Sequence, residues 1–213
     1  MSDFDFFSAR RPSTFAAGAM IATSHPLATA AGLEVLQDGG NAVDAAIAAV
    51  AVQCVVDPLM TGIGGDCFAL YAPAGGKVKA LNGSGRAPAA ASVSALAALG
   101  VTGEIPQTSA HAVTVPGAIS AWCRLHGDHG SLPLERLFMR AIAYARLGFA
   151  VTPRVAMDWK TNEALIGGDE HAAAVFLPQG KAPAVGEIIR QPLLADRLEE
   201  IAAGGAAAFY EGE

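Results

Sequence analysis

The chain has 213 residues, of which 52% are hydrophobic and 16% are charged, and its formal net charge is −6. This length fits one domain or part of a larger one, and the apolar fraction suits a packed core, which argues against disorder. The acidic balance and the lack of a basic stripe argue against nucleic acid or an anionic membrane as a partner.

The cysteines and the N-terminal segment bear on the cellular compartment. Cys54, Cys67 and Cys123 are widely spaced and form no CxxC pair, which favours reduced thiols and a cytoplasmic location. Residues 1–19 look like a lead-in segment, and no apolar stretch follows the arginines in it, so a secretory signal is not expected. Residues 42–56 are very apolar but shorter than the roughly 20 residues of a membrane span.

The first predicted elements in chain order are a short strand at 20–23 and a helix that ends near Asp38. Ser24 is the expected N-cap of this helix, and Pro26 suits its first turn. His25 is expected to shape the entry into the helix.

A second helix is predicted directly after the first. Gly39 and Gly40 end the first helix, Asn41 can cap the second, and Pro58 stops it after about residue 56. The two helices would form a helical hairpin, and their many alanines would let the two backbones approach closely.

A β-hairpin is predicted next, from a strand at 67–72, a turn at 74–76 and a returning strand at 77–81. The spacing describes an antiparallel pair, not a Rossmann crossover. The glycine-rich turn at 61–66 lacks the Gly-Lys-Ser/Thr ending of a phosphate loop and precedes a strand, so its expected role is tight backbone packing. A polar, glycine-rich loop follows at 82–88.

The remainder of the chain is predicted to be mostly helical, because apolar residues recur at helical spacing. The predicted helices cover residues 92–99, 117–126, 133–147, 153–166 and 192–203. Val115-Pro116-Gly117 leads into the second of these, and a structural role is favoured for it. No further element is predicted at 208–213.

The sequence contains no complete catalytic set. The histidines form no HExxH pattern or zinc-site spacing, so no metal or other cofactor is predicted. Ser84 lies between two glycines but not in a GxSxG elbow, and no nucleophile, base and orienting group can be assembled.

Arg86 is the most interesting charged residue, because it lies in a polar loop after a strand and glycines beside it let a ligand approach the backbone. A guanidinium in that place can clamp a carboxylate with two parallel hydrogen bonds. The alternative is an ion pair that ties the loop to the body of the protein.

A series of motifs resembles the γ-glutamyltransferase family. The matching segments are 22–28 (ATSHPLA), 31–36 (AGLEVL), 39–46 (GGNAVDAA), 62–65 (GIGG), 115–117 (VPG), 148–149 (GF), 153–154 (PR), 209–210 (FY) and 212–213 (GE). They span nearly the whole chain in the family's order, and the GGNAVDA block is quite specific.

The resemblance implies an α/β (α+β) fold, part of the αββα sandwich of an N-terminal nucleophile hydrolase. Residues 1–213 would be the N-terminal portion of the large subunit, helix-rich with antiparallel strands. Family precursors cut themselves, and the new N-terminal Thr of the small subunit takes the acyl group of glutathione or a related amide. That threonine is not in this chain, so the chain alone is expected to be inactive.

The resemblance also places a departure at the 82–88 loop. Family members that accept γ-glutamyl substrates hold the α-carboxylate with an arginine, followed by Glu, before an Ala-Pro pair. Aligning Ala87-Pro88 puts Ser84 at the arginine position and Gly85 at the glutamate position, so Arg86 is two residues late. Arg86 and Ser84 are the candidate substrate-binding residues, and an acylase-like relative with another acyl donor, or an inactive truncated module, are the alternatives.

An incomplete fold of this kind leaves sheet edges and helix faces uncovered. We therefore expect either exposed apolar surface or a partner chain, which would be the small subunit or a second copy.

Overall fold

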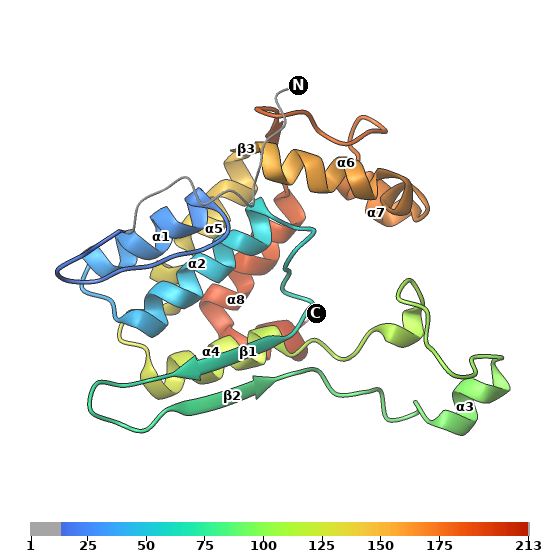
Figure 1. The fold of residues 1–213 in the computed structure, drawn as a ribbon, viewed down its shortest axis with the longest axis horizontal. Coiled ribbons are helices and arrows are strands. Elements are labelled where there is room, and N and C mark those ends of the chain that lie inside the picture. Colours follow the sequence, from blue (N-terminus) through green and yellow to red (C-terminus); the bar gives the residue numbers. More distant parts are fainter. Residues whose placement is uncertain (1–13, 213) are drawn as a thin grey trace.

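The structure, a computed structural model, describes residues 14–212. Its elements in chain order are α1 (Pro26–Gln37), α2 (Ala42–Val56), β1 (Cys67–Tyr71), β2 (Lys79–Gly83), α3 (Val93–Ala98), η1 (Ala110–Ala112), α4 (Ala118–His129), α5 (Leu134–Leu147), β3 (Phe149–Ala150), α6 (Pro153–Gly167), α7 (Glu170–Phe176), β4 (Ile188–Ile189) and α8 (Pro192–Tyr210) (Figure 1).

Helices α1, α2, α5 and α8 form the helical body, in which α2 packs against α1 and α5, and α5 packs against α8 (Figure 1). Helix α2 is apolar on all sides and almost wholly buried, as expected of a central helix. Its alanines allow close approach, and large side chains of the neighbouring helices, such as Phe138 of α5 and Leu198 of α8, are almost wholly buried.

The entry to α1 differs from the prediction. The N-cap is His25, whose Nδ1 accepts a hydrogen bond from the Leu27 N–H at 3.2 Å. The prediction of Ser24 as the N-cap is wrong, because the Ser24 hydroxyl instead accepts a hydrogen bond from Gln53 Nε2 at 2.6 Å. The strand predicted at 20–23 is also wrong, since this segment is irregular and pairs with no strand within the described residues.

The start of α2 confirms the predicted cap and also fixes a distant loop. Asn41 Oδ1 accepts from the Val43 and Asp44 N–H groups, and Asp44 Oδ2 accepts from the Asn41 N–H at 2.9 Å, which completes a capping box. The buried Asp44 carboxylate also accepts from Ser131, whose hydroxyl lies 2.5 Å away and whose N–H lies 3.0 Å away. One side chain thus joins the α2 start to the α4–α5 connection.

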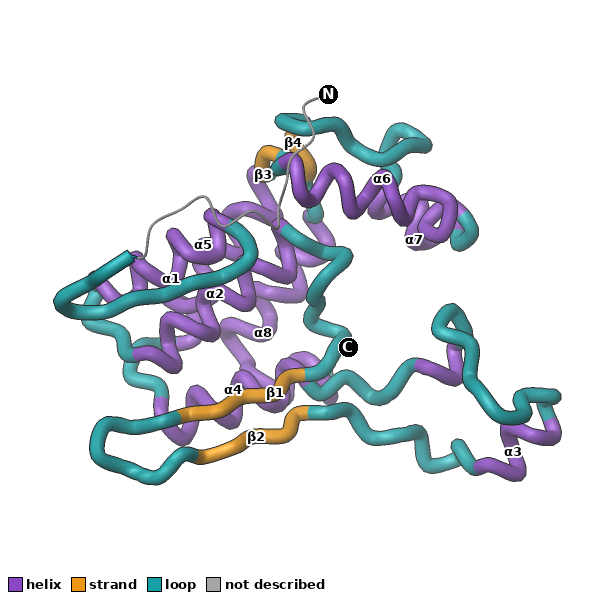
Figure 2. Tube along the Cα trace, viewed as in Figure 1, coloured by secondary structure: helices purple, strands orange, loops and turns teal. Residues whose placement is uncertain are grey.

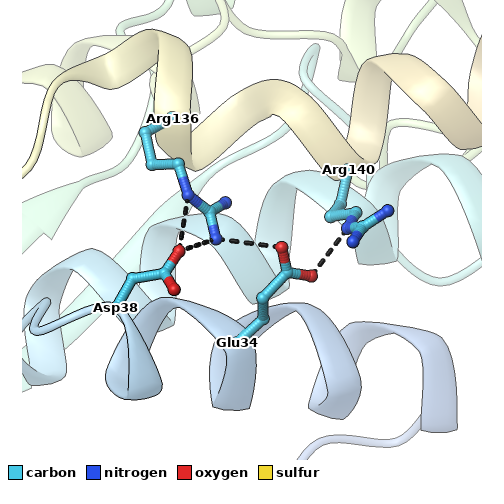
Figure 3. A network of polar contacts seen from close by, with 4 residues as sticks. All are labelled: Glu34, Asp38, Arg136 and Arg140. Carbon is cyan, nitrogen blue, oxygen red and sulfur yellow. Dashed lines mark hydrogen bonds and ion pairs between the residues drawn. The ribbon is translucent and has the colours of Figure 1, made fainter.

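An ion-pair network joins α1 to α5 (Figure 3). Arg136 contacts both Asp38 and Glu34, and Arg140 Nε lies 2.6 Å from Glu34 Oε2. The hydrogen bond from Arg140 is the main reason that the pKa of Glu34 is lowered. These side chains are partly exposed, so each pair contributes at most about 1 kcal/mol.

The β1–β2 pair is the predicted antiparallel hairpin, with Cys67 opposite Gly83 and Tyr71 opposite Lys79. Its second strand begins and ends two residues later than the predicted 77–81. The hairpin lies beside α4 and packs on it with one face (Figure 2). The other face is open, with Phe68 69% exposed and Leu70 80% exposed. This confirms the expected exposed apolar surface.

The predicted helices at 92–99, 133–147 and 153–166 are confirmed with small shifts of their ends, and α4 continues three residues beyond the predicted 117–126. Helix α8 extends to Tyr210 across a kink at Gly205, which has φ 61° and ψ −147°. The predicted end at residue 203 was wrong. Helix α7, η1 and the short β3–β4 pair were not predicted.

Within residues 14–212, none of the helices has both the length and the apolar character needed to cross a membrane.

Candidate functional site

Segments far apart in the sequence meet at the end of the hairpin. The carbonyl oxygen of Gly65 accepts hydrogen bonds from the N–H groups of Gly117 and Ala118 at 3.0 and 2.9 Å. The Arg86 carbonyl accepts from the Val115 N–H at 3.0 Å. The glycine-rich turn before β1, the loop after β2 and the start of α4 therefore form one backbone cluster.

Glycine is needed in the loop after β2 and at the start of α4, because backbones nearly touch there. A Cβ atom added to Gly117 would lie 2.1 Å from the Gly83 carbonyl oxygen. A Cβ atom added to Gly85 would lie 2.0 Å from the Val115 carbonyl oxygen. Real Cβ contacts are never this short, so the structural role predicted for the Val-Pro-Gly segment is borne out, and close packing extends to the 82–88 loop. The packing role predicted for the 61–66 turn is wrong at Gly62 and Gly64, where an added Cβ atom would meet nothing within 4 Å.

Side-chain oxygens hold the loop after β2. Asp66 Oδ1 accepts from the Gly85 N–H, and Asn82 Oδ1 accepts from the Ser84 N–H, both at 2.9 Å. Sequence reasoning missed both roles. Asn82 precedes a Gly-Ser pair, which is a local signal for such a turn, whereas Asp66 acts across 19 residues and left no local signal.

Tyr210 completes the cluster from the end of α8. Its hydroxyl donates to the Pro116 carbonyl at 2.7 Å and accepts from the Ser120 N–H at 3.2 Å. The sequence marked residues 209–210 as a motif but assigned them no role.

A surface pocket of about 420 Å³ lies on this cluster. It is lined by Leu81, Asn82, Gly83, Ser84, Gly85, Arg86, Val115, Pro116, Gly117, Ser120, Ala121 and Arg124. Both residues singled out in the sequence, Ser84 and Arg86, therefore line the same pocket.

The two arginines of the pocket differ in their partners. Arg124 Nε lies 2.7 Å from Asp128 Oδ2, one helical turn away. Arg86 is exposed and has no side-chain hydrogen bond or ion pair with any residue in the described range 14–212. The ion pair weighed as its alternative role is not formed there, and the guanidinium is open to a ligand.

The three cysteine thiols are poorly suited to act as nucleophiles. Burial raises the pKa of the Cys54 thiol to about 12 and raises the pKa of Cys67 and of Cys123. All three are free thiols, and a protonated thiol is a poor nucleophile. No group of His, Cys, Asp or Glu in the part of the chain that the structure describes is arranged to hold a metal ion.

Comparison with known proteins identifies the family of the chain. The sequence profile of the family described as Gamma-glutamyltranspeptidase matches residues 28–213. The chain belongs to the gamma-glutamyltranspeptidase family. The motif series in the sequence had indicated this membership.

Curated relatives in this family carry different names. The chain is 36% identical to the Acylase ACY 1 proenzyme of Pseudomonas sp. (strain V22), over 98% of this chain and 39% of that protein. It is 38% identical to the Glutathione hydrolase-like YwrD proenzyme of Bacillus subtilis (strain 168), over 91% of this chain and 37% of that protein. The chain thus spans about two fifths of the length of these relatives.

Solved structures show the same fold. The cephalosporin acylase from Bacillus halodurans superposes with a TM-score of 0.85 at 40% identity, covering 98% of this chain and 41% of that chain. The Helicobacter pylori gamma-Glutamyltranspeptidase superposes with a TM-score of 0.86 at 30% identity, covering 93% and 58%. The fold expected from the resemblance, the helix-rich part of an N-terminal nucleophile hydrolase with antiparallel strands, is confirmed.

Proposed function

We propose that this chain supplies the substrate-side part of an amidohydrolase or acyltransferase that acts on glutathione or related γ-glutamyl amides. Arg86 binds the substrate carboxylate in the pocket at the end of β2. The observation that supports this role is an exposed guanidinium, unpaired within residues 14–212, that lines a pocket whose backbone walls are fixed by glycines.

The chemistry runs through a threonine outside residues 1–213. Its hydroxyl attacks the amide carbonyl and passes its proton, through the threonine α-amino group, to the departing amine as the C–N bond breaks. Water or an amino acid then attacks the resulting ester and releases the threonine. Residues of this chain bind and orient the acyl group, and no cofactor takes part.

A second candidate function is an acylase that takes another acyl donor. The displacement of Arg86 by two residues from the family's arginine position favours it, and Ser84 stands where that arginine is expected. Each charge-assisted hydrogen bond contributes about 1.5–3 kcal/mol. Loss of an arginine that holds the substrate carboxylate with two such bonds therefore weakens the preference for carboxylate-bearing substrates by several kcal/mol.

The open face of the β1–β2 hairpin is the surface that a partner would cover. We propose that the second subunit, formed when the proenzyme is cut, covers the open hairpin face that carries Phe68 and Leu70. The proenzyme names of the curated relatives and the exposure of these two side chains support this assignment.

Three anilides with five-carbon acyl groups separate the two functions. Full-length, self-cleaved protein is assayed with γ-glutamyl, glutaryl and pentanoyl anilides, of which only the first two carry a carboxylate. We expect Arg86→Ala to raise KM for the two carboxylates about tenfold to a hundredfold and to leave the pentanoyl substrate unchanged.

Arg197→Ala is the matched control, because Arg197 pairs with Glu200 on α8, away from the pocket. Equal KM values for wild type and Arg86→Ala on every substrate would contradict the proposed role. Turnover of the pentanoyl anilide alone would favour the acylase. A full-length product that stays uncut by mass would argue against both.

A further inference from the structure

The start of α4 is capped by a residue from the far end of the chain. Its N-cap is Gly117, which has no side chain to accept from the first-turn N–H groups. The Ser120 N–H, at the position that an N-cap side chain commonly satisfies, donates to the Tyr210 hydroxyl at 3.2 Å. The same hydroxyl donates to the Pro116 carbonyl at 2.7 Å, so it bridges both sides of Gly117.

The kink in α8 brings Tyr210 to this position. Gly205 has φ 61° and ψ −147°, a conformation that other residues rarely adopt, and it redirects the last turn of α8 onto α4 (Figure 1). Within that turn, the ring of Phe209 makes an edge-to-face contact with the ring of Tyr210, with ring centres 4.9 Å apart. Tyr210 is held at the start of α4 by the two hydrogen bonds of its hydroxyl, with Ser120 and Pro116.

The segment that Tyr210 holds is also the support of Arg86. Val115 donates its N–H to the Arg86 carbonyl at 3.0 Å, and its own carbonyl lies against Gly85. The Arg86 side chain has no partner of its own in the described part of the chain. Its location therefore depends on the backbone of the Val115–Pro116–Gly117 turn.

We propose that Tyr210 is a positioning residue for substrate binding, whose hydroxyl locks the turn that sets where the Arg86 guanidinium stands. This inference rests on the proposed function, since it requires that Arg86 bind a carboxylate. It adds a specificity-determining contact that lies outside the pocket lining and acts through the backbone.

A double-mutant cycle in the full-length protein tests the coupling. Tyr210→Phe removes only the hydroxyl, and we expect it to raise KM for γ-glutamyl and glutaryl anilides about three- to tenfold, with kcat and the pentanoyl anilide unchanged. In the Arg86→Ala background, Tyr210→Phe is expected to add nothing, because the group that it positions is already gone. An equal increase in both backgrounds, or on the pentanoyl anilide, would show a general structural role and overturn the proposal.

Hydrogen exchange checks the geometry independently of substrate. In Tyr210→Phe, the Ser120 amide is expected to exchange about fivefold faster, while Ala141 in α5 keeps its rate. Unchanged exchange at Ser120 would overturn the bridging contact. If Arg86→Ala leaves KM unaltered while Ser120 exchange does respond, the proposed function fails and the Tyr210 contact stands as a helix cap without a role in binding.

Discussion

The helical body and the β1–β2 hairpin are ordered by different kinds of contact. In the body, side chains of α1, α2, α5 and α8 interlock, and large residues such as Phe138 and Leu198 are almost wholly buried. At the end of the hairpin, backbone meets backbone, and Gly83, Gly85 and Gly117 leave no room for side chains. The body therefore derives its stability from burial, whereas the candidate site derives its shape from close backbone approach and side-chain caps.

A large loss of stability is expected from Asp44→Ala in the body. The substitution removes the acceptor of the Asn41 N–H and of both Ser131 donors in a buried setting. We expect a loss of about 3 kcal/mol in the free energy of unfolding at neutral pH, measured by urea titration. Asp196→Ala is the control, because Asp196 makes only a half-exposed ion pair with Arg146, and it should cost under about 1 kcal/mol.

Asp44 should also make the free energy of unfolding depend on pH. Burial alone raises the pKa of Asp44, but hydrogen bonds from Ser131, Asn41 and Leu132 outweigh it, and the pKa is lowered. A lowered folded pKa means that the stabilisation is present above the ordinary aspartate value of 3.8 and is lost as the pH falls through the folded value. The difference in free energy of unfolding between wild type and Asp44→Ala should therefore decrease as the pH falls below 3.8 and through the folded pKa of Asp44. A difference that stays constant over this range would contradict the prediction.

Much of the body could be predicted from the sequence because its signals are local. Asn41 and Pro58 bound α2 correctly, and the apolar run between them marked it as buried. The cap of α1 could not be predicted, because Ser24 is engaged by Gln53, 29 residues away. A tertiary contact of this kind leaves no trace in the neighbouring residues.

In the candidate site, too, features with a local sequence signal could be predicted and features set by distant contacts could not. The position of Arg86 and Ser84 beside a glycine-rich loop was evident from the sequence, and the structure places both on one pocket. The contribution of Asp66 and that of Tyr210 arise only when distant segments meet. The end of α8 was misplaced for the same reason, since its last turn is held by contacts with α4 across the Gly205 kink.

Gly117, the N-cap of α4, and Gly127, inside α4, differ in the space around them. Gly117→Ala would place a Cβ atom 2.1 Å from the Gly83 carbonyl, whereas Gly127 has nothing within 4 Å. We expect Gly117→Ala to lower the free energy of unfolding by about 1–3 kcal/mol. We also expect it to weaken substrate binding in the full-length protein. Gly127→Ala should instead stabilise by up to about 1 kcal/mol, because alanine is the better helix former. Thermal unfolding of both variants measures the difference, and shifts of the same sign would contradict it.

The smallest effect is expected from Leu70→Ala on the open face of the hairpin. Leu70 is 80% exposed, so its truncation removes little buried surface, and the free energy of unfolding of the isolated chain should change by less than about 0.5 kcal/mol. Leu198→Ala, the same change in the buried body, should cost about 3–5 kcal/mol. If the second subunit covers the hairpin, Leu70→Ala should become costly only in the full-length protein, where thermal unfolding would show a clear decrease. A loss of that size in the isolated chain would instead mean that the hairpin face is already packed, and the two regions would no longer differ as described.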